Sequence, residues 1–297
     1  MMKKCYHALP VFSMFLVSFI FLVTRSAIAG PPVVNIEGEG GGGLVPWAYL
    51  TNPPADGQLF GNPSVGSTYI FPQNFNVNVY HFNETISDRL ELGFARTVFD
   101  TTNILGGNGL NIGIDELTID TYHAKVLLLK ETDTLPAVSV SIEYKKNQDI
   151  AHADKNGGGA FTSTGMDDDS GLDYCLSVTK LYKGWKMPVL INLSGRYTKA
   201  AQTGYLGFSK NGNFEPEASL AVLPESNVAV GVEFRGKPNE YKSVAGIGSF
   251  QEDNWTDFFI AYFPTKGLSI TGAVVNFGNI VNRNVNTGLY MNMKYDF

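Results

Sequence analysis

Residues 138–145 read Val138-Ser139-Val140-Ser141-Ile142-Glu143-Tyr144-Lys145, so apolar and polar side chains alternate without a break. Residues 228–235 repeat this alternation as Val228-Ala229-Val230-Gly231-Val232-Glu233-Phe234-Arg235. A period of two is typical of a β-strand whose two faces meet different surroundings. Similar runs, most of about nine to twelve residues, cover 90–99, 172–182, 189–199, 214–223, 254–263, 268–276 and 287–297. The sequence therefore predicts an all-β fold.

The connections between these runs alternate in length. Short segments rich in turn formers lie at 83–88, 131–136, 183–187, 224–227 and 264–266. Longer segments lie between them at 100–115, 147–171, 200–213, 238–253 and 277–285. A soluble sandwich has no reason for this regularity, whereas outer-membrane barrels have short periplasmic turns and long extracellular loops.

Three further strands complete the predicted count. A first strand is expected at 66–71, and alternation from Phe75 to the turn at 83–88 gives the next. A third is expected at 116–130, where the alternation slips near 120–122, as a bulge would cause. With them the chain has about twelve strands, and an even number suits a closed single-chain barrel. We therefore predict that residues 65–297 form a closed antiparallel transmembrane β-barrel with short periplasmic turns and long extracellular loops.

Closure of the sheet decides which side chains face lipid. Hydrocarbon offers backbone groups no hydrogen-bond partner, so a membrane-spanning sheet must have no open edge. The apolar positions are then expected to face lipid, the polar positions the lumen, and the aromatic residues both interfaces. On this assignment the outer girdle contains Tyr144, Tyr174, Tyr197 and Phe234, and the periplasmic girdle contains Tyr182, Tyr262, Tyr295 and Phe297.

Residues 1–29 have the features of a cleaved signal peptide. Lys3 and Lys4 precede a mostly apolar run at 8–23, and Ala27-Ile28-Ala29 supplies the small residues of a cleavage site. Without Lys3, Lys4 and Arg25, 19 of the 22 basic residues remain against 28 acidic ones, a net charge of −9. This acidic balance argues against nucleic acid as a partner. The predicted location is the bacterial outer membrane.

The C-terminal residues Leu289-Tyr290-Met291-Asn292-Met293-Lys294-Tyr295-Asp296-Phe297 place one apolar face before a final Phe. This segment resembles the terminal strand that the assembly machinery of bacterial outer-membrane barrels recognises, and the resemblance implies that machinery as a partner. Gly41 to Ala48, Arg89 to Asp100, Glu252 to Asp257 and Gly278 to Ile280 resemble segments of an uncharacterised proteobacterial family. The resemblance covers most of the mature chain and implies a barrel fold, but no activity or site.

Residues 30–64 form a Gly- and Pro-rich segment before the barrel. The run Gly38-Glu39-Gly40-Gly41-Gly42-Gly43 lacks the Lys and Ser/Thr of a phosphate-binding loop, and its composition is that of a flexible linker. Such a linker lets residues 44–50, with Trp47 and Tyr49, lie on the periplasmic mouth or enter the lumen as a plug. Exposure of Trp47 to periplasmic water would be unfavourable.

Charged residues recur at inward-facing positions of neighbouring strands. The lumen-lining candidates are Glu143, Lys145, Asp173, Arg196, Glu215, Glu217, Glu233, Arg235 and Asp257. Mixed charges of this kind either fill and rigidify a barrel or select permeating solutes. Our leading hypothesis is a narrow porin-like channel for small hydrophilic solutes, with charge preference set by these residues. The alternative is a non-conducting structural or adhesion barrel that acts through its extracellular loops.

The third and least favoured alternative is a barrel enzyme acting on lipid. A barrel enzyme acting on lipid needs a Ser beside a His, and neither His81 nor His123 has one as a near neighbour in sequence. His152 and Asp154 do not have the spacing of an omptin-like protease site. We therefore predict no catalytic residue and no cofactor, and Cys175 alone provides no thiolate metal site.

Two groups of charged residues are expected near the extracellular rim. Asp167, Asp168 and Asp169 offer oxygen ligands for a divalent cation, although a hydrated loop explains them better. Outward-facing cations at the outer strand ends are Arg96, Lys146 and Lys199. These cations either contact lipopolysaccharide phosphates or extend into the headgroup region alongside outer-membrane lipid.

Overall fold

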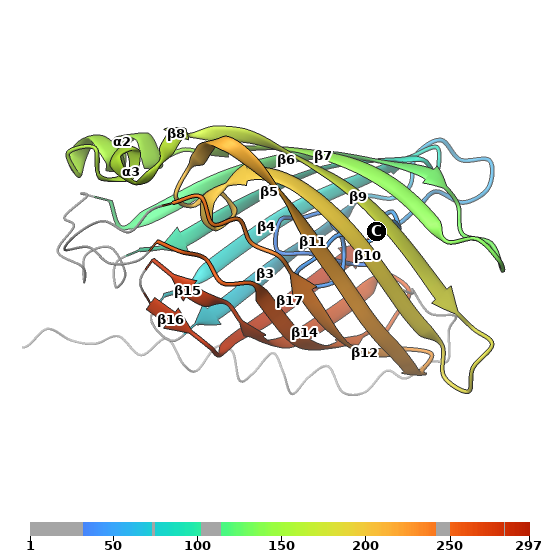
Figure 1. Cartoon of the computed structure of the whole chain (residues 1–297). Helices are drawn as coiled ribbons and strands as arrows, with labels where there is room; N and C mark the ends of the chain where they lie inside the picture. Colours follow the sequence, from blue (N-terminus) through green and yellow to red (C-terminus); the bar gives the residue numbers. More distant parts are fainter. Residues whose placement is uncertain (1–31, 73–74, 102–113, 242–249, 282) are drawn as a thin grey trace, which may run out of the picture.

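The computed structural model describes residues 32–72, 75–101, 114–241, 250–281 and 283–297 (Figure 1). The predicted signal peptide at 1–29 lies outside these residues. Each strand of the main sheet pairs antiparallel with its neighbours, and the last strand pairs with the first, which closes the barrel. The strands of the wall are β3 (Ser64–Pro72), β4 (Val77–Ile86), β5 (Leu90–Asp100), β6 (Glu116–Leu129), β7 (Ala137–Asn147), β9 (Ser170–Tyr182), β10 (Val189–Ala200), β11 (Phe208–Glu225), β12 (Val228–Arg235), β13 (Trp255–Tyr262), β14 (Leu268–Asn276) and β17 (Gly288–Asp296). The predicted closed barrel of twelve strands is confirmed.

The remaining elements are short. At the extracellular end lie α2 (Ile150–Asn156), α3 (Ala160–Thr164), η2 (Ala201–Gly204), β15 (Gly278–Ile280), β16 (Arg283–Val285) and β8 (Met166–Asp168), the last of which pairs with an extension of β11 (Figure 1). A small hairpin of β1 (Val33–Val34) and β2 (Gly40–Gly41) belongs to the N-terminal segment. In the described part of the chain, none of the helices is long and apolar enough to cross a membrane.

The two faces of the wall have opposite chemistry. Large apolar side chains such as Ile142, Leu193 and Phe258 are exposed on the outside, while Glu143 and Lys145 on the inward parity are buried. A soluble barrel would bury the apolar set, so this arrangement suits a wall surrounded by lipid. The predicted girdle tyrosines are likewise exposed, with Tyr144 and Tyr174 toward the outer strand ends and Tyr182 and Tyr295 toward the periplasmic ends.

Strand β6 departs from the prediction in one respect. The irregularity in its pairing lies between Leu127 and Leu129, not near 120–122. The alternation slips at 120–122 because Leu117 and Ile119 face inward into an apolar part of the interior, while Tyr122 further along faces outward. The break in the alternation therefore reflects a change of the interior from apolar to polar along the barrel axis. It does not mark the extra residue of a β-bulge.

Residues 32–51, which we call the inserted segment, lie inside the barrel (Figure 1). The segment begins at the periplasmic end, where the Lys294 amine donates to the Pro32 carbonyl at 3.3 Å. It extends outward to Ile36, turns back through the glycine run, and returns to Leu50, which packs with Leu127 and Ala137. Both ends of the inserted segment therefore lie on the periplasmic side.

Candidate functional site: the occupied lumen

The wall of the barrel satisfies the backbone of the inserted segment. The Glu91 carboxylate accepts hydrogen bonds from the amides of Gly40 at 3.0 Å and Thr51 at 2.6 Å, and the Glu233 carboxylate accepts one from the Leu44 amide at 2.7 Å. The Pro46 carbonyl accepts hydrogen bonds from Asn192 and from Ser194, both at 3.1 Å. Buried backbone groups need such partners, so wall side chains replace water around this segment.

Trp47 is the largest apolar side chain of the inserted segment and lies inside the barrel. It is 1% exposed, and its indole nitrogen donates a hydrogen bond to the Ser219 hydroxyl at 2.8 Å. Tyr49 is half-buried nearer the periplasmic mouth, where its hydroxyl donates to the Glu131 carboxylate. The two residues proposed from sequence as a plug thus belong to the part of the chain that fills the lumen.

The glycine run is packed tightly against the wall. A Cβ atom at Gly42 would overlap the Glu233 carboxylate, and a Cβ atom at Gly41 would overlap the Val45 carbonyl. A Cβ atom at Gly43 would lie 3.3 Å from the Asp257 carboxylate. The interpretation of this run as a flexible linker is therefore wrong, because its glycines allow a close approach between backbone and carboxylates.

A network of buried charges surrounds Glu37 of the inserted segment. Its carboxylate contacts Arg235 Nη2 at 2.7 Å and Arg196 Nη2 at 3.4 Å, and it accepts a hydrogen bond from Lys145. On the wall, Glu143 pairs with Arg196 at 2.8 Å. All of these side chains are buried, so their mutual pairing offsets the loss of water around them.

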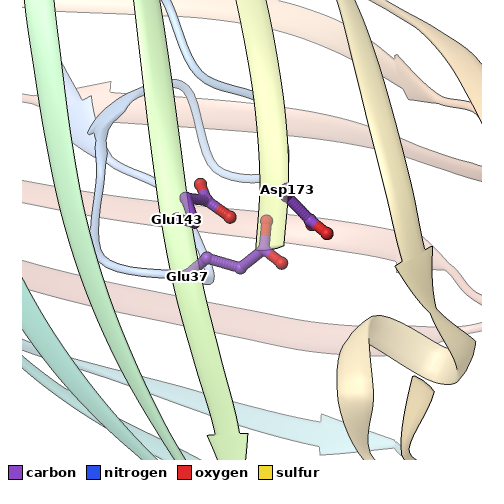
Figure 2. Close-up of side chains that lie close together, drawn as sticks. All are labelled: Glu37, Glu143 and Asp173. Carbon is purple, nitrogen blue, oxygen red and sulfur yellow. The ribbon is translucent and has the colours of Figure 1, made fainter. Parts of the chain in front are cut away.

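Figure 2 shows the side chains of Glu37, Glu143 and Asp173 close together. One oxygen of each lies within 4.8 Å of the others, a spacing that a metal ion could bridge. The Lys145 ammonium, however, contacts all three carboxylates, with 3.0 Å to Glu143 and 2.5 Å to Asp173. A lysine thus supplies the positive charge of the cluster, which makes it an ion-pair network and a poor metal site.

A second network lies around Lys125. Its ammonium contacts the Glu39 carboxylate at 3.2 Å and donates to the Gly40 carbonyl at 2.6 Å. Glu91 lies beside it and contacts His123 at 3.1 Å. His81 is buried in the interior as well, and in the described part of the chain neither histidine is hydrogen-bonded to a serine.

The structure brings most of the predicted lumen residues together. Buried on the inside of the wall are Glu143, Lys145, Asp173, Arg196, Glu217, Glu233, Arg235 and Asp257. Glu215 is only half-buried and makes no salt bridge with any described residue. Sequence reasoning missed Glu37, Glu39, Glu91 and Lys125. Glu91 and Lys125 occupy inward positions of their strands, so strict alternation through β5 and β6 would have found them.

An apolar cluster closes the outer end of the lumen. It contains side chains of the wall, of the inserted segment and of the extracellular loops, and a cavity of only about 20 Å³ remains between them. That volume has room for about one water molecule. We call the following set the outer apolar cluster: Ile36, Ile70, Phe75, Val77, Phe99, Tyr205, Trp255, Phe277 and Ile280.

Aromatic contacts hold the outer apolar cluster together. Phe99 lies 4.9 Å from Phe75 and 4.7 Å from Tyr205, and Trp255 lies 4.9 Å from Phe277, measured between ring centroids. The Lys237 ammonium lies 4.2 Å from the centroid of the Trp255 ring.

Next to this cluster, loop residues form a buried ion pair. The Lys237 ammonium lies 3.1 Å from the Glu252 carboxylate, which also accepts a hydrogen bond from the Gln202 amide at 2.7 Å. Burial raises the pKa of Glu252 although Lys237 opposes the shift, and burial lowers the pKa of Lys237 although Glu252 opposes it. Both shifts follow from the burial of these two side chains.

The periplasmic end is open by comparison. A cavity of about 520 Å³ lies between the inserted segment and the wall, lined among others by Tyr49, Lys130, Glu131 and Lys294. Among the described residues, the lumen is thus accessible from the periplasm and filled in the middle by the inserted segment, and the outer apolar cluster packs across its outer end.

Two of the three cations predicted at the rim pair with carboxylates of the chain. Arg96 is outward-facing and pairs with Asp120 at 2.7 Å, and Lys146 pairs with Asp169. Lys199 is half-buried on the outside. The contact of these cations with lipopolysaccharide phosphates stays a prediction. Recognition of Leu289 to Phe297 by the assembly machinery also stays a prediction.

The loop candidates are used locally. The Asp154 carboxylate accepts hydrogen bonds from the amides of Phe161 at 2.6 Å and Thr162 at 3.0 Å, so it caps α3 and is not aimed at His152. His152 instead contacts Asn156 at 3.1 Å. The Asp168 carboxylate accepts hydrogen bonds from the backbone amides of Asp169 and Ser170. Backbone groups of the loop thus act as hydrogen-bond partners of this acidic side chain.

The fold and the lumen define a transmembrane β-barrel of the outer-membrane type with an occupied interior. Residues 30–294 match the family described as "Protein of unknown function (DUF3034)", and the chain belongs to that family. The resemblance to an uncharacterised barrel family is thereby confirmed. A comparison with curated proteins gives no match.

Solved structures with a similar fold share little sequence with this chain. The KdgM porin is 8% identical, with 79% of this chain and 99% of that chain covered and a TM-score of 0.48. Omp33 of Acinetobacter baumannii is 12% identical, with 80% and 99% covered and a TM-score of 0.45. Outer membrane phospholipase A from Escherichia coli is 7% identical, with 78% and 92% covered and a TM-score of 0.38. Barrels of this kind carry different functions, so the fold alone does not assign one.

Proposed function

We propose that the protein is a narrow outer-membrane channel for small hydrophilic solutes and that the inserted segment is its removable plug. The observation that carries this proposal is the polar interface between the inserted segment and the wall. Glu37, Glu39, Gly40 and Leu44 are held by charged or polar wall side chains, and water can replace each of these contacts when the segment leaves.

The path of the inserted segment supports its release. Both of its ends lie at the periplasmic mouth, so the segment can leave as a hairpin without threading its chain through the barrel. The cavity of about 520 Å³ beside Tyr49 and Lys294 lies on the same side. Release toward the periplasm therefore needs no strand of the wall to open.

Single-channel conductance in planar bilayers tests the proposal. We expect the full chain to be mostly closed in KCl and a variant lacking residues 30–50 to give reproducible steps, because the deletion empties the lumen and also removes Ile36 from the outer apolar cluster. Heat-modifiable migration in gels shows that the shortened barrel is folded. The matched control is Asp56→Asn, which alters an exposed residue between the inserted segment and β3 and leaves the conductance of the full chain unchanged.

A second candidate function is favoured by the outer apolar cluster. Its loop residues Tyr205, Phe277 and Ile280 close the extracellular mouth, as expected of a non-conducting structural barrel that acts through its loops. To separate the two, Phe277→Ser is combined with the deletion of 30–50. A folded double variant without conductance would refute the channel and leave the structural barrel.

A further inference from the structure

Two wall cations take most of their partners from the inserted segment. Arg235 contacts Glu37 at 2.7 Å and donates to the Leu44 carbonyl at 3.1 Å, whereas its wall partner Glu217 is 3.4 Å away. Lys125 contacts Glu39 at 3.2 Å, whereas its wall partner Glu91 is 3.9 Å away. Release of the segment removes the nearest anion from both cations.

The wall carboxylates do not lose their ionic partners in the same way. Glu143 keeps Arg196 at 2.8 Å, Asp173 keeps Lys145 at 2.5 Å, and Glu217 keeps Arg196 at 2.8 Å. All of these groups belong to the wall. Departure of the segment therefore leaves the position of the Glu37 carboxylate empty and Arg235 without its nearest anion, while Arg196 and Lys145 keep their wall carboxylates.

The position that Glu37 occupies has the geometry of a carboxylate site. Arg235 Nη2, Arg196 Nη2 and Lys145 Nζ converge on one carboxylate, and each of these three side chains is at most 3% exposed. The Nη2 atom of Arg196 donates no hydrogen bond in the described part of the chain. Both guanidinium groups contact the Oε2 oxygen of Glu37, and Lys145 donates to its Oε1 oxygen, so a carboxylate with two oxygens suits the three cations better than a spherical anion does.

We propose that the channel takes small solutes that bear a carboxylate, and that the solute carboxylate competes with Glu37 for Arg235, Arg196 and Lys145. This inference rests on the proposed function, since it assigns the solute class of the same lumen. The Glu37 side chain is then an internal substitute for the solute. A solute that reaches the site from the periplasmic cavity disfavours return of the inserted segment and provides Arg235 with an anion in place of Glu37.

The first test uses the folded variant that lacks residues 30–50. Glucuronate, a hexose carrying one carboxylate, is added during KCl conductance, with glucose as the neutral probe. We expect glucuronate to interrupt the current and glucose to have no effect. Arg235→Gln is expected to raise the glucuronate concentration that blocks half of the current about tenfold or more. This is the change in affinity expected when one charge-assisted hydrogen bond is lost. Arg235→Lys keeps the charge and is expected to show a smaller shift.

The control for charge is Lys210→Gln, which removes one cation from an exposed position of β11 and is expected to leave the half-block unchanged. If the shortened barrel conducts KCl but glucuronate and glucose have the same effect on the current, the proposed carboxylate site is refuted and the proposed channel function is retained. An equal shift of the half-block in Arg235→Gln and Lys210→Gln would also rule out the carboxylate site and leave the channel.

The second test uses the full chain and does not depend on conductance. Hydrogen exchange at the Gly40 and Leu44 amides reports release of the inserted segment. Glucuronate is expected to accelerate exchange at both amides several-fold over glucose at the same concentration. Acceleration in a protein whose shortened form never conducts would refute the channel but keep the carboxylate site. Equal exchange in the two sugars would refute the site.

Discussion

The inserted segment and the outer apolar cluster close the same lumen by different means. Hydrogen bonds and ion pairs at Glu37, Gly40 and Leu44 hold the segment, together with the buried side chain of Trp47. The cluster is held by packing between apolar side chains such as Phe99 and Trp255. Its loop members can only reach the cluster from the extracellular side, whereas the segment enters from the periplasm.

The difference matters because the two kinds of contact respond differently to water. Each hydrogen bond that the segment loses on release is replaced by one to water, so the net cost of a single contact is about 1 kcal/mol. Exposing the outer apolar cluster to water costs about 25 cal/mol per Å² of apolar surface, and no new hydrogen bond offsets this cost. We therefore expect the inserted segment to be the part that solution conditions and solutes release.

The largest effect is expected from Trp47→Ala. This substitution removes a fully buried indole and its hydrogen bond to Ser219, which costs roughly 4 kcal/mol. This free energy is lost from binding of the segment in the lumen. The wall keeps its stability, because its strands pair with one another without the segment. Limited proteolysis should then cut within 32–63 while the barrel stays heat-modifiable.

Trp185→Ala is the matched control for this change. Trp185 is 63% exposed in the periplasmic turn between β9 and β10, so its removal should leave the protease pattern as it is. Cleavage of the wall itself in the Trp47→Ala protein would show that the segment supports the barrel, and the contrast between the two regions would fail.

The second effect concerns the outer apolar cluster. Phe277→Ala removes a buried ring that packs edge-on against Trp255, at a cost of about 3 kcal/mol. In the full chain the inserted segment still fills the lumen, so we expect little conductance. In the variant lacking 30–50 the same substitution should raise the open time in planar bilayers. An equal rise in both backgrounds would mean that the segment does not close the lumen.

The contrast between these regions also shows what could be predicted from the sequence. Alternation at residues such as Val140 and Glu143 identifies the two faces of each strand, and the fold follows because only closure satisfies the backbone in lipid. Alternation does not report whether the interior is dry or wet at a given depth. For that reason the inward-facing Leu117 and Ile119 imitate a bulge in the sequence.

The inserted segment is harder to predict for a different reason. A glycine run is equally compatible with a mobile linker and with close packing, and only the partner surface decides between them. For Gly42 that surface is the Glu233 carboxylate, which is 191 residues further along the chain and has no local signal in the sequence. The wall charges can be predicted because each lies on a regular strand, whereas Glu37 and Glu39 lie in an irregular segment.

A third, smaller effect is expected from Gly42→Ala. The added Cβ overlaps the Glu233 carboxylate, which must shift and strain its hydrogen bond with the Leu44 amide, at a cost of about 2 kcal/mol. Hydrogen exchange at Leu44 should accelerate accordingly. Gly184→Ala is the control, because its Cβ would meet nothing within 4 Å. Equal exchange in the two variants would show that the glycine run is not tightly packed in solution.

The smallest effect is expected from salt. Raising KCl from about 0.1 M to about 1 M shortens the Debye length from about 10 Å to about 3 Å, which weakens the attraction of a released segment, with its acidic Glu37 and Glu39, for the cationic wall. Exchange at the Leu44 amide should rise a few-fold. The Phe277 amide, bonded to the Val285 carbonyl at 3.0 Å beside the outer apolar cluster, should be unaffected, since that closure depends on packing. If both amides accelerate together, salt loosens the whole barrel and the two closures are not independent.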